Sequence, residues 1–229
     1  MSITKMLIFK ERSNMENKIT VLLSDINGLN ENDLANILDS LPINIANKIN
    51  EKAKLKSKLL RAVSYKMLLD YCGFNKGNAP EIKSKENGKP YFEGIDICFS
   101  ISHSKTMAAL AVAPTEVGID IERLDKNRDY LDLAKRYFTE NEYERIKEST
   151  DVKDTFVKYW TAKEAYIKYT GEGFKNGVKY FEAVFEDEKA YYKGENMPSL
   201  YTKKIKNEYY LSLVYEGEKK IGIIKRKDL

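Results

Sequence analysis

Two long helical segments, each followed by several short strands, limit the fold of this chain more than any other feature. Apolar residues recur at helical period through residues 45–71, and a second long helix is predicted for residues 152–169. The predicted strands are residues 95–101, 107–113 and 117–122 after the first helix, and 180–185, 190–193, 208–215 and 221–225 after the second. This order predicts an α+β fold of two similar halves, each a long helix packed on a small, mainly antiparallel sheet.

The most favourable boundary between the halves lies near Ala113 and Pro114, where a strand ends. Because no Ser- or Gly-rich linker lies there, we expect an N-terminal half of residues 15–113 and a C-terminal half of residues 114–229 that pack tightly. Residues 1–14 are predicted to be an extension outside the core. Two similar halves would supply both sides of a site within one chain, which favours a monomer.

Composition indicates a globular protein of a reducing compartment. Of the 229 residues, 42% are hydrophobic and 32% are charged, and no apolar run is long enough to span a membrane. The first residues lack the apolar core of a signal peptide. The two cysteines, Cys72 and Cys98, are too few for a disulfide framework, so we expect a cytoplasmic location.

The charge balance is mixed and mildly basic. The chain has 39 basic and 35 acidic residues, a net charge of +4 that permits an anionic ligand or an acidic protein partner. Its 16 tyrosines and many lysines could stack on and neutralise RNA. No recognisable RNA-binding motif interleaves the two, so we expect no nucleic-acid partner.

Residues 117–123 read V-G-I-D-I-E-R, with two acids two positions apart in a β-branched run. On a strand, Asp120 and Glu122 would share one face while Ile119 and Ile121 share the other. Like charges so placed repel, and a divalent cation such as Mg²⁺ would remove that cost while also binding phosphate oxygens. Two solvated acids on an edge strand are the ordinary alternative, and the spacing alone favours it.

The second long helix carries a stripe of functional side chains. Trp160, Glu164 and Lys168 stand four apart, which places an aromatic ring, a carboxylate and an ammonium along one side of the helix. A surface ion pair between Glu164 and Lys168 would explain the last two equally well, and Trp160 would then be a packing residue.

Further candidates for phosphate contacts lie in the first half. Ser102 and His103 end a buried-looking strand, Lys89 stands between Gly88 and Pro90 on a restrained loop, and Arg61 lies on the first long helix. Each has an ordinary alternative as a capping residue, a turn residue or a solvated helix residue. The nearby basic residues Lys54, Lys56 and Lys58 could add phosphate contacts, although their register is not fixed by the sequence.

Taken together, five motifs occur in one order: G-K-P-Y, S-I-S-H-S, G-I-D-I-E, F-T-E-N-E-Y and W-T-A-K-E-A-Y-I-K. From about Met15 to Leu213 the chain resembles the surfactin-type 4′-phosphopantetheinyl transferases. That family moves the phosphopantetheine arm of coenzyme A to a serine of an apo acyl or peptidyl carrier protein and releases 3′,5′-ADP. The resemblance implies two α+β halves with the active site between them.

The resemblance also implies a role for each motif residue. The Mg²⁺ ligands would be Asp120, Glu122 and Glu164, and Lys168 would contact the pyrophosphate of coenzyme A. Glu142 matches a position tied to the metal or the base. The remaining coenzyme A contacts would be Arg61, Lys89, Pro90, Ser102 and His103, with Arg61 and His103 nearest the 3′-phosphate.

Several points stay open at the level of sequence. The base that activates the carrier serine is Glu164 or Glu142, acting directly or through a metal-bound water. Mn²⁺ could replace Mg²⁺, and fatty-acid, polyketide and non-ribosomal peptide carriers are all compatible with the motifs. A Mg²⁺-dependent hydrolase of nucleotide pyrophosphates is a competing function. A non-catalytic binding module is another, and the complete set of three carboxylates argues against it.

Overall fold

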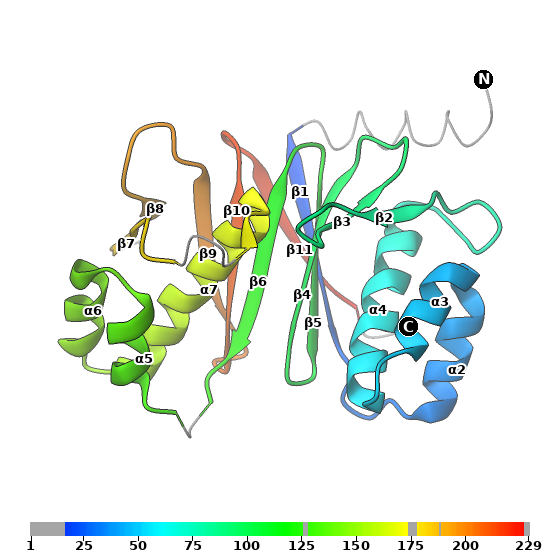
Figure 1. Ribbon diagram of the computed structural model, residues 1–229, viewed down its shortest axis with the longest axis horizontal. Helices are drawn as coiled ribbons and strands as arrows, with labels where there is room; N and C mark the ends of the chain where they lie inside the picture. The colour runs from blue at the N-terminus through cyan, green and yellow to red at the C-terminus, as the bar shows by residue number, and fades with distance from the viewer. Residues whose placement is uncertain (1–16, 126–127, 174–177, 188, 227–229) are drawn as a thin grey trace. The chain divides into compact units, whose positions relative to one another are not determined.

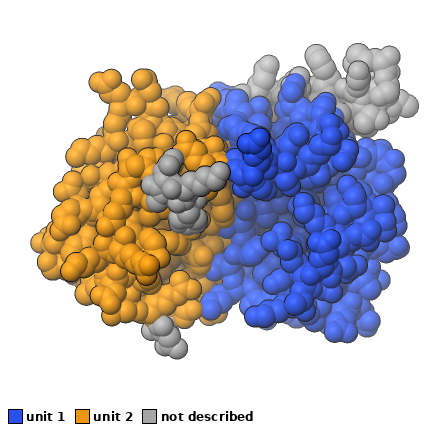
Figure 2. All heavy atoms as spheres, in the orientation of Figure 1, with its two compact units in different colours: residues 1–116, 219–229 blue, residues 117–218 orange. Residues whose placement is uncertain are grey.

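The computed structural model describes residues 17–125, 128–173, 178–187 and 189–226. The chain forms two compact units: unit 1 comprises residues 1–116 and 219–229, and unit 2 comprises residues 117–218 (Figure 2). The division predicted from the sequence differs from this one, because it places residues 219–229 with the second half. The extension predicted for residues 1–14 lies outside the described residues.

Unit 1 is built on a four-stranded sheet in the order β11-β1-β5-β4 (Figure 1). Its strands are β1 (Lys18–Asp25), β4 (Cys98–Ser104), β5 (Met107–Ala113) and β11 (Lys220–Arg226). Neighbouring strands run antiparallel except for β1 and β11, which are parallel. Every residue of β5 is buried, as expected for a strand with neighbours on both edges and a helix over one face.

The described helices of unit 1 are α2 (Glu31–Ser40), α3 (Ile43–Asn50) and α4 (Leu55–Tyr71), and α4 packs against β5. The prediction of one helix over residues 45–71 is wrong, because α3 and α4 are separate helices. Between Ile49 and Leu59 the only apolar residues are Ala53 and Leu55, and both are exposed. No buried face therefore holds residues 51–54 in a helix, since most helical stability in proteins comes from packing.

A small hairpin completes the described part of unit 1. It consists of β2 (Ile82–Ser84) and β3 (Pro90–Phe92), which pair antiparallel. The turn between them contains Gly88 at a φ of 85°, a left-handed conformation that glycine adopts without strain. The backbone N–H of Lys85 donates to the carbonyl oxygen of Lys89, so both lysines are carried by this turn.

Unit 2 has a three-stranded antiparallel sheet in the order β6-β10-β9 and a separate pair, β7 with β8. The strands are β6 (Val117–Arg123), β7 (Ala183–Glu186), β8 (Lys189–Tyr192), β9 (Ser199–Ile205) and β10 (Tyr209–Tyr215). The sequence prediction did not include β9. Strand β9 lies at the edge of its sheet, where side chains are less buried than in a central strand. Its residues S-L-Y-T-K-K-I therefore show no clear apolar alternation.

The helices of unit 2 are α5 (Tyr130–Tyr137), α6 (Glu140–Lys147) and α7 (Val152–Thr170). Helix α7 lies on the sheet against β6 and β10 and ends at Gly171, which has a left-handed φ of 72° (Figure 1). Within the F-T-E-N-E-Y motif, the residues T-E-N-E are a capping-box pattern that predicts a helix start at Thr139. Thr139 caps α6 and forms this capping box with Glu142.

The predicted α+β class is confirmed, since each unit has a long helix on a mainly antiparallel sheet. In the part of the chain that the structure describes, no helix is both long enough and apolar enough to span a lipid bilayer.

Candidate active site

Asp120 is the centre of the candidate site in unit 2. Its side chain is only 5% exposed, and its Oδ1 accepts a hydrogen bond of 2.7 Å from Nζ of Lys168 on α7. Its Oδ2 is also buried and accepts no hydrogen bond from the residues that the structure describes. The predicted strand-and-helix arrangement is therefore present, with the ammonium of Lys168 placed against the carboxylate of Asp120.

Gly118 sets the distance between α7 and β6. A Cβ atom at this position would lie 2.1 Å from the carbonyl oxygen of Ala165 and 2.5 Å from the backbone nitrogen of Tyr169. Because Gly118 and Asp120 are two residues apart on one strand, both face α7. The missing side chain allows the helix backbone to approach β6 closely enough for Lys168 to reach Asp120.

Glu164 experiences the charges of both acids of β6. The pKa of its carboxyl is raised to about 7, first by partial burial and then by the negative charges of Asp120 and Glu122, while Lys168 acts in the opposite direction. The three predicted carboxylates and Lys168 thus influence one another electrostatically within unit 2. A carboxyl with a pKa near neutrality is suited to accept or release a proton.

These carboxylates do not form a closed ligand cluster. Among the described residues, no group of three or more His, Cys, Asp or Glu side chains is gathered closely enough to hold a metal ion. The chemistry of the donors nevertheless fits one, because carboxylate oxygens are the preferred ligands of Mg²⁺ and Mn²⁺. A cation there would relieve the repulsion that raises the pKa of Glu164.

Trp160 and Glu142 lie in other surroundings. Trp160 belongs to an aromatic cluster with Tyr137, Phe138 and Phe156, which agrees with the packing alternative. Glu142 is fully buried, and both of its carboxylate oxygens accept hydrogen bonds from protein groups. It therefore has no contact with the surface at which a substrate would bind.

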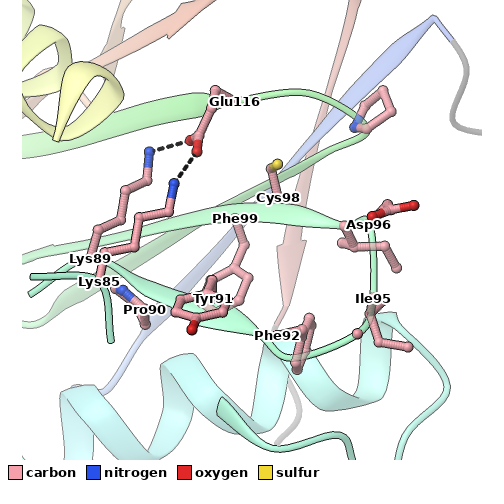
Figure 3. A pocket seen from close by; sticks show the side chains of 13 residues that line it. Lys85, Lys89, Pro90, Tyr91, Phe92, Ile95, Asp96, Cys98, Phe99 and Glu116 are labelled. Carbon is pink, nitrogen blue, oxygen red and sulfur yellow. Dashed lines mark hydrogen bonds and ion pairs between the residues drawn. The ribbon is translucent and has the colours of Figure 1, made fainter. Parts of the chain in front are cut away.

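In unit 1, Lys89 and Pro90 line a cavity of about 420 Å³ (Figure 3). Nζ of Lys89 lies 2.7 Å from Oε2 of Glu116, and Lys85 pairs with the other oxygen of the same carboxylate. Burial lowers the pKa of Lys89, although the hydrogen bond to Glu116 acts against that shift. Aromatic and aliphatic side chains also line the cavity, among them Tyr91, Phe92, Ile95 and Phe99.

Arg61 lines a different cavity, of about 220 Å³, together with Lys48, Tyr65 and neighbouring residues. No residue lines both of these cavities. Ser102 is buried in β4, and His103 beside it is exposed. Neither Ser102 nor His103 lines either cavity.

Sequence reasoning missed three residues of these sites. Gly118 stands inside the G-I-D-I-E motif, and a glycine in a strand interior is itself a signal of close backbone approach. Glu116, the partner of Lys85 and Lys89, has no sequence signal, because a hairpin 27 residues away brings Lys89 to it. Lys163, which forms an ion pair with Glu142, lies within the W-T-A-K-E-A-Y-I-K motif, but the four-residue spacing selects Trp160, Glu164 and Lys168 instead.

The strand with the paired acids thus lies against the helix that carries Glu164 and Lys168. Residues 116–222 match the family model of the 4′-phosphopantetheinyl transferase superfamily. This segment contains all the carboxylates assigned above, together with Lys168, and it begins after Arg61, Lys89, Ser102 and His103.

The chain is also similar to several curated 4′-phosphopantetheinyl transferases. It is 37% identical over 120 residues to HetI of Nostoc, a match that covers 49% of this chain and 50% of that protein. It is 35% identical over 107 residues to an enzyme of Bacillus subtilis, covering 45% and 47%. It is 39% identical over 93 residues to gsp of Aneurinibacillus migulanus, covering 40% and 38%.

The chain spans about half the length of the curated relatives it matches, or less. The similarity over residues 116–222 agrees with the family predicted from the motifs.

Proposed function

We propose that this protein transfers the 4′-phosphopantetheine arm of coenzyme A to a serine of an apo acyl or peptidyl carrier protein. The observation that carries the proposal is the arrangement of Asp120, Glu164 and Lys168 within the segment that matches the family. The products would be a holo carrier protein and 3′,5′-ADP, which is the activity of a holo-carrier-protein synthase.

The chemistry is a substitution at phosphorus. The serine oxygen forms a bond to the β-phosphorus of coenzyme A, the bond from that phosphorus to the bridging oxygen breaks, and 3′,5′-ADP leaves. The serine hydroxyl loses its proton to a base. Of the two candidates, Glu164 is better placed than Glu142, since Glu142 is enclosed by protein.

Asp120, Glu122 and Glu164 are the residues that would hold Mg²⁺, or Mn²⁺ in its place. The cation would neutralise the pyrophosphate of coenzyme A and polarise the phosphorus under attack. Lys168, whose side chain is 30% exposed, would contact the pyrophosphate from the helix side. Its ammonium is mobile enough to exchange one anionic partner for another, since the lysine stem has several rotatable bonds.

Coenzyme A contacts in unit 1 are proposed for Lys89 and Pro90, and for Ser102, His103 and Arg61 on the family resemblance. The cavity at Lys89 combines an ammonium with apolar side chains, a composition suited to the nucleotide or the pantetheine arm of coenzyme A. A net charge of +4 suits an acidic carrier protein. Because Cys72 and Cys98 form no disulfide, a reducing cytoplasmic compartment is proposed, with the protein acting as a monomer.

The test is incubation with an apo carrier protein, coenzyme A and Mg²⁺, followed by intact mass measurement of the carrier. A gain of one phosphopantetheine is expected, and Asp120→Ala and Glu164→Ala should abolish it. The proposal fails if carriers of the fatty-acid, polyketide and peptide types all stay unmodified. Turnover of coenzyme A without a carrier would instead support the pyrophosphate hydrolase.

A further inference from the structure

Lys163 and Glu142 form an ion pair that has no contact with solvent. Both side chains have an exposed fraction of 0%, and Nζ of Lys163 lies 2.8 Å from Oε2 of Glu142. Nζ also donates to the carbonyl oxygens of Val178, at 2.6 Å, and Phe181. An ammonium has three N–H donors, so each has an acceptor within the protein.

Glu142 is engaged just as completely. Its Oε1 accepts from the backbone N–H of Ala183 at 2.8 Å, and its Oε2 accepts from the backbone N–H of Thr139 at 2.9 Å as well as from Lys163. The pair thereby ties α7 to the start of α6 and to the segment that leads into β7. The ring of Phe181, centred 4.3 Å from Nζ, closes one side of the ammonium.

The pair holds α7 on the side that faces away from the sheet. Thr161 and Lys168 point toward the sheet, because Thr161 accepts a hydrogen bond from Ser212 on β10 and Lys168 reaches Asp120 on β6. At about 100° per residue, Lys163 lies roughly 200° round the helix from Thr161. Gly118 therefore sets the distance of α7 from β6, while Lys163 resists its rotation.

Rotation of α7 matters because Glu164 directly follows Lys163. Side chains extend about 6 Å from a helix axis, so a rotation of about 20° would move the carboxylate of Glu164 by about 2 Å. Functional groups need placement to within about 0.5 Å and 10–20°. Loss of the contacts of Lys163 would therefore displace the side chains of Glu164 and Lys168 even in a protein that still folds.

We propose that the buried Glu142–Lys163 pair is a positioning element that fixes the rotation of α7, and through it the places of Glu164 and Lys168 opposite Asp120. Glu142 then acts through Lys163 and is not the base. The inference rests on the proposed function for its use of a cation site, and it adds Lys163 as a residue on which that site depends.

Stability alone is a poor explanation for such a pair. Replacing a buried ion pair by uncharged residues of similar volume is often neutral or stabilising, because desolvation of two charges opposes their attraction. A pair kept only for stability could be replaced without effect on the site. A positioning pair could be replaced without loss of the fold, but not without loss of the geometry around Asp120.

The main test compares the wild type with the double variant Glu142→Gln/Lys163→Met, which removes both charges and nearly preserves volume. We expect the double variant to fold but to bind Mn²⁺ at least tenfold more weakly than the wild type. Binding is measured by electron paramagnetic resonance, which detects the free Mn²⁺ ion. Leu200→Ala on β9, which truncates a buried side chain of the same unit, is the control for general destabilisation and should bind Mn²⁺ normally.

A second measurement needs no metal. The ammonium protons of Lys168 should give a protected NMR signal in the wild type, because its ion pair with Asp120 slows their exchange. The signal should disappear in Asp120→Asn and in the double variant, and it should persist in Leu200→Ala. If Asp120→Asn binds Mn²⁺ as tightly as the wild type, the proposed cation site fails, and the Lys168 signal still decides the positioning role.

Wild-type Mn²⁺ affinity together with an unchanged Lys168 signal in the double variant would overturn the inference. If that variant does not fold, Lys163→Arg replaces it, since this change keeps a charge opposite Glu142. A planar guanidinium does not match the acceptor geometry around Lys163, so Mn²⁺ affinity should fall at least threefold in the folded protein. Unchanged affinity in Lys163→Arg would equally contradict the proposal.

Discussion

The two units bury different kinds of polar residue. Among the described residues, the buried charged side chains are Asp120, Glu142 and Lys163, and all three belong to unit 2. The described buried polar residues of unit 1 are serines and Thr20, whereas its cavity residues Lys89 and Arg61 keep some contact with solvent. The core of unit 2 is also richer in aromatic rings, which surround the ammonium of Lys163.

This difference indicates two ways of presenting charge. Unit 2 fixes its charges through buried partners, so their geometry is set before any ligand arrives, at a cost in desolvation. Unit 1 presents lysine and arginine side chains at cavity walls, where they can adjust to a ligand. A substitution that removes a charge should therefore cost far more in unit 2 than in unit 1.

The sharpest contrast is between two lysines on the two long helices. Lys163→Met leaves Glu142 buried without its partner, and we expect a loss of about 3–5 kcal/mol in the free energy of unfolding. Lys66→Met on α4 breaks a partly exposed pair with Asp70 and should cost about 0.5 kcal/mol or less. Urea unfolding of both variants measures the difference, and equal losses would remove the distinction between the units.

Glycine positions offer a second contrast. Gly118→Ala places a methyl group against the backbone of α7, so the helix must move and we expect a loss of about 1–3 kcal/mol. The Lys168–Asp120 contact should weaken at the same time. Gly77→Ala in unit 1 meets only an Asn75 oxygen at 3.5 Å and should stay within about 0.5 kcal/mol of the wild type. Thermal unfolding that ranks the two variants the other way would contradict the assignment of Gly118.

The two units should also respond to pH with opposite signs. The pKa of Glu164 is about 7 in the folded protein and 4.5 for an unperturbed glutamate, as in the unfolded chain, so the folded form binds more protons between these values. The free energy of unfolding should therefore fall by about 2 kcal/mol, after solvent screening, as pH rises from 4.5 to about 7. Glu164→Gln should abolish this fall in urea titrations.

Glu116 in unit 1 is the matched case of opposite sign. Burial alone would raise the pKa of its carboxyl, but hydrogen bonds from Lys85 and Lys89 outweigh that effect and lower it. Its contribution to stability is therefore present above the unfolded pKa and is lost as pH falls through the folded one. Glu116→Gln should flatten only the acid side of the profile, and an effect near pH 7 would argue against the pairing.

The smallest effect is expected at Lys85. Its side chain is 44% exposed, so Lys85→Met should change the free energy of unfolding by less than about 1 kcal/mol. A loss as large as that of Lys163→Met would show that unit 1 also depends on fixed charges.

The sequence predicts the elements whose apolar pattern is regular. Alternation around Asp120 identifies β6, and the capping box at Thr139 identifies the start of α6. The division between α3 and α4 and the edge strand β9 escape prediction, because tertiary packing decides them. Local patterns do not specify which strand meets which, so the pairing of β11 with β1 is also absent from the sequence signal.

The candidate site shows the same limit. The residue types at Asp120, Glu164 and Lys168 follow from motif and spacing, and the structure shows Lys168 against Asp120. A motif does not show which of its residues are buried. From sequence alone Glu142 and Lys163 are therefore indistinguishable from exposed helix charges, and only the structure shows their partners at residues 178–183. Whether Lys89 and Arg61 share a cavity likewise depends on packing between segments that the sequence does not relate.

Strand β11 has a consequence for biosynthesis. Residues 220–226 pair with β1, but they leave the ribosome only after all of unit 2 has been made. Until then β1, whose six central residues are buried in the finished protein, has one edge without its parallel neighbour. Open strand edges invite pairing with other chains. Nascent chains stalled within unit 2 should therefore depend on chaperones more than the completed protein does.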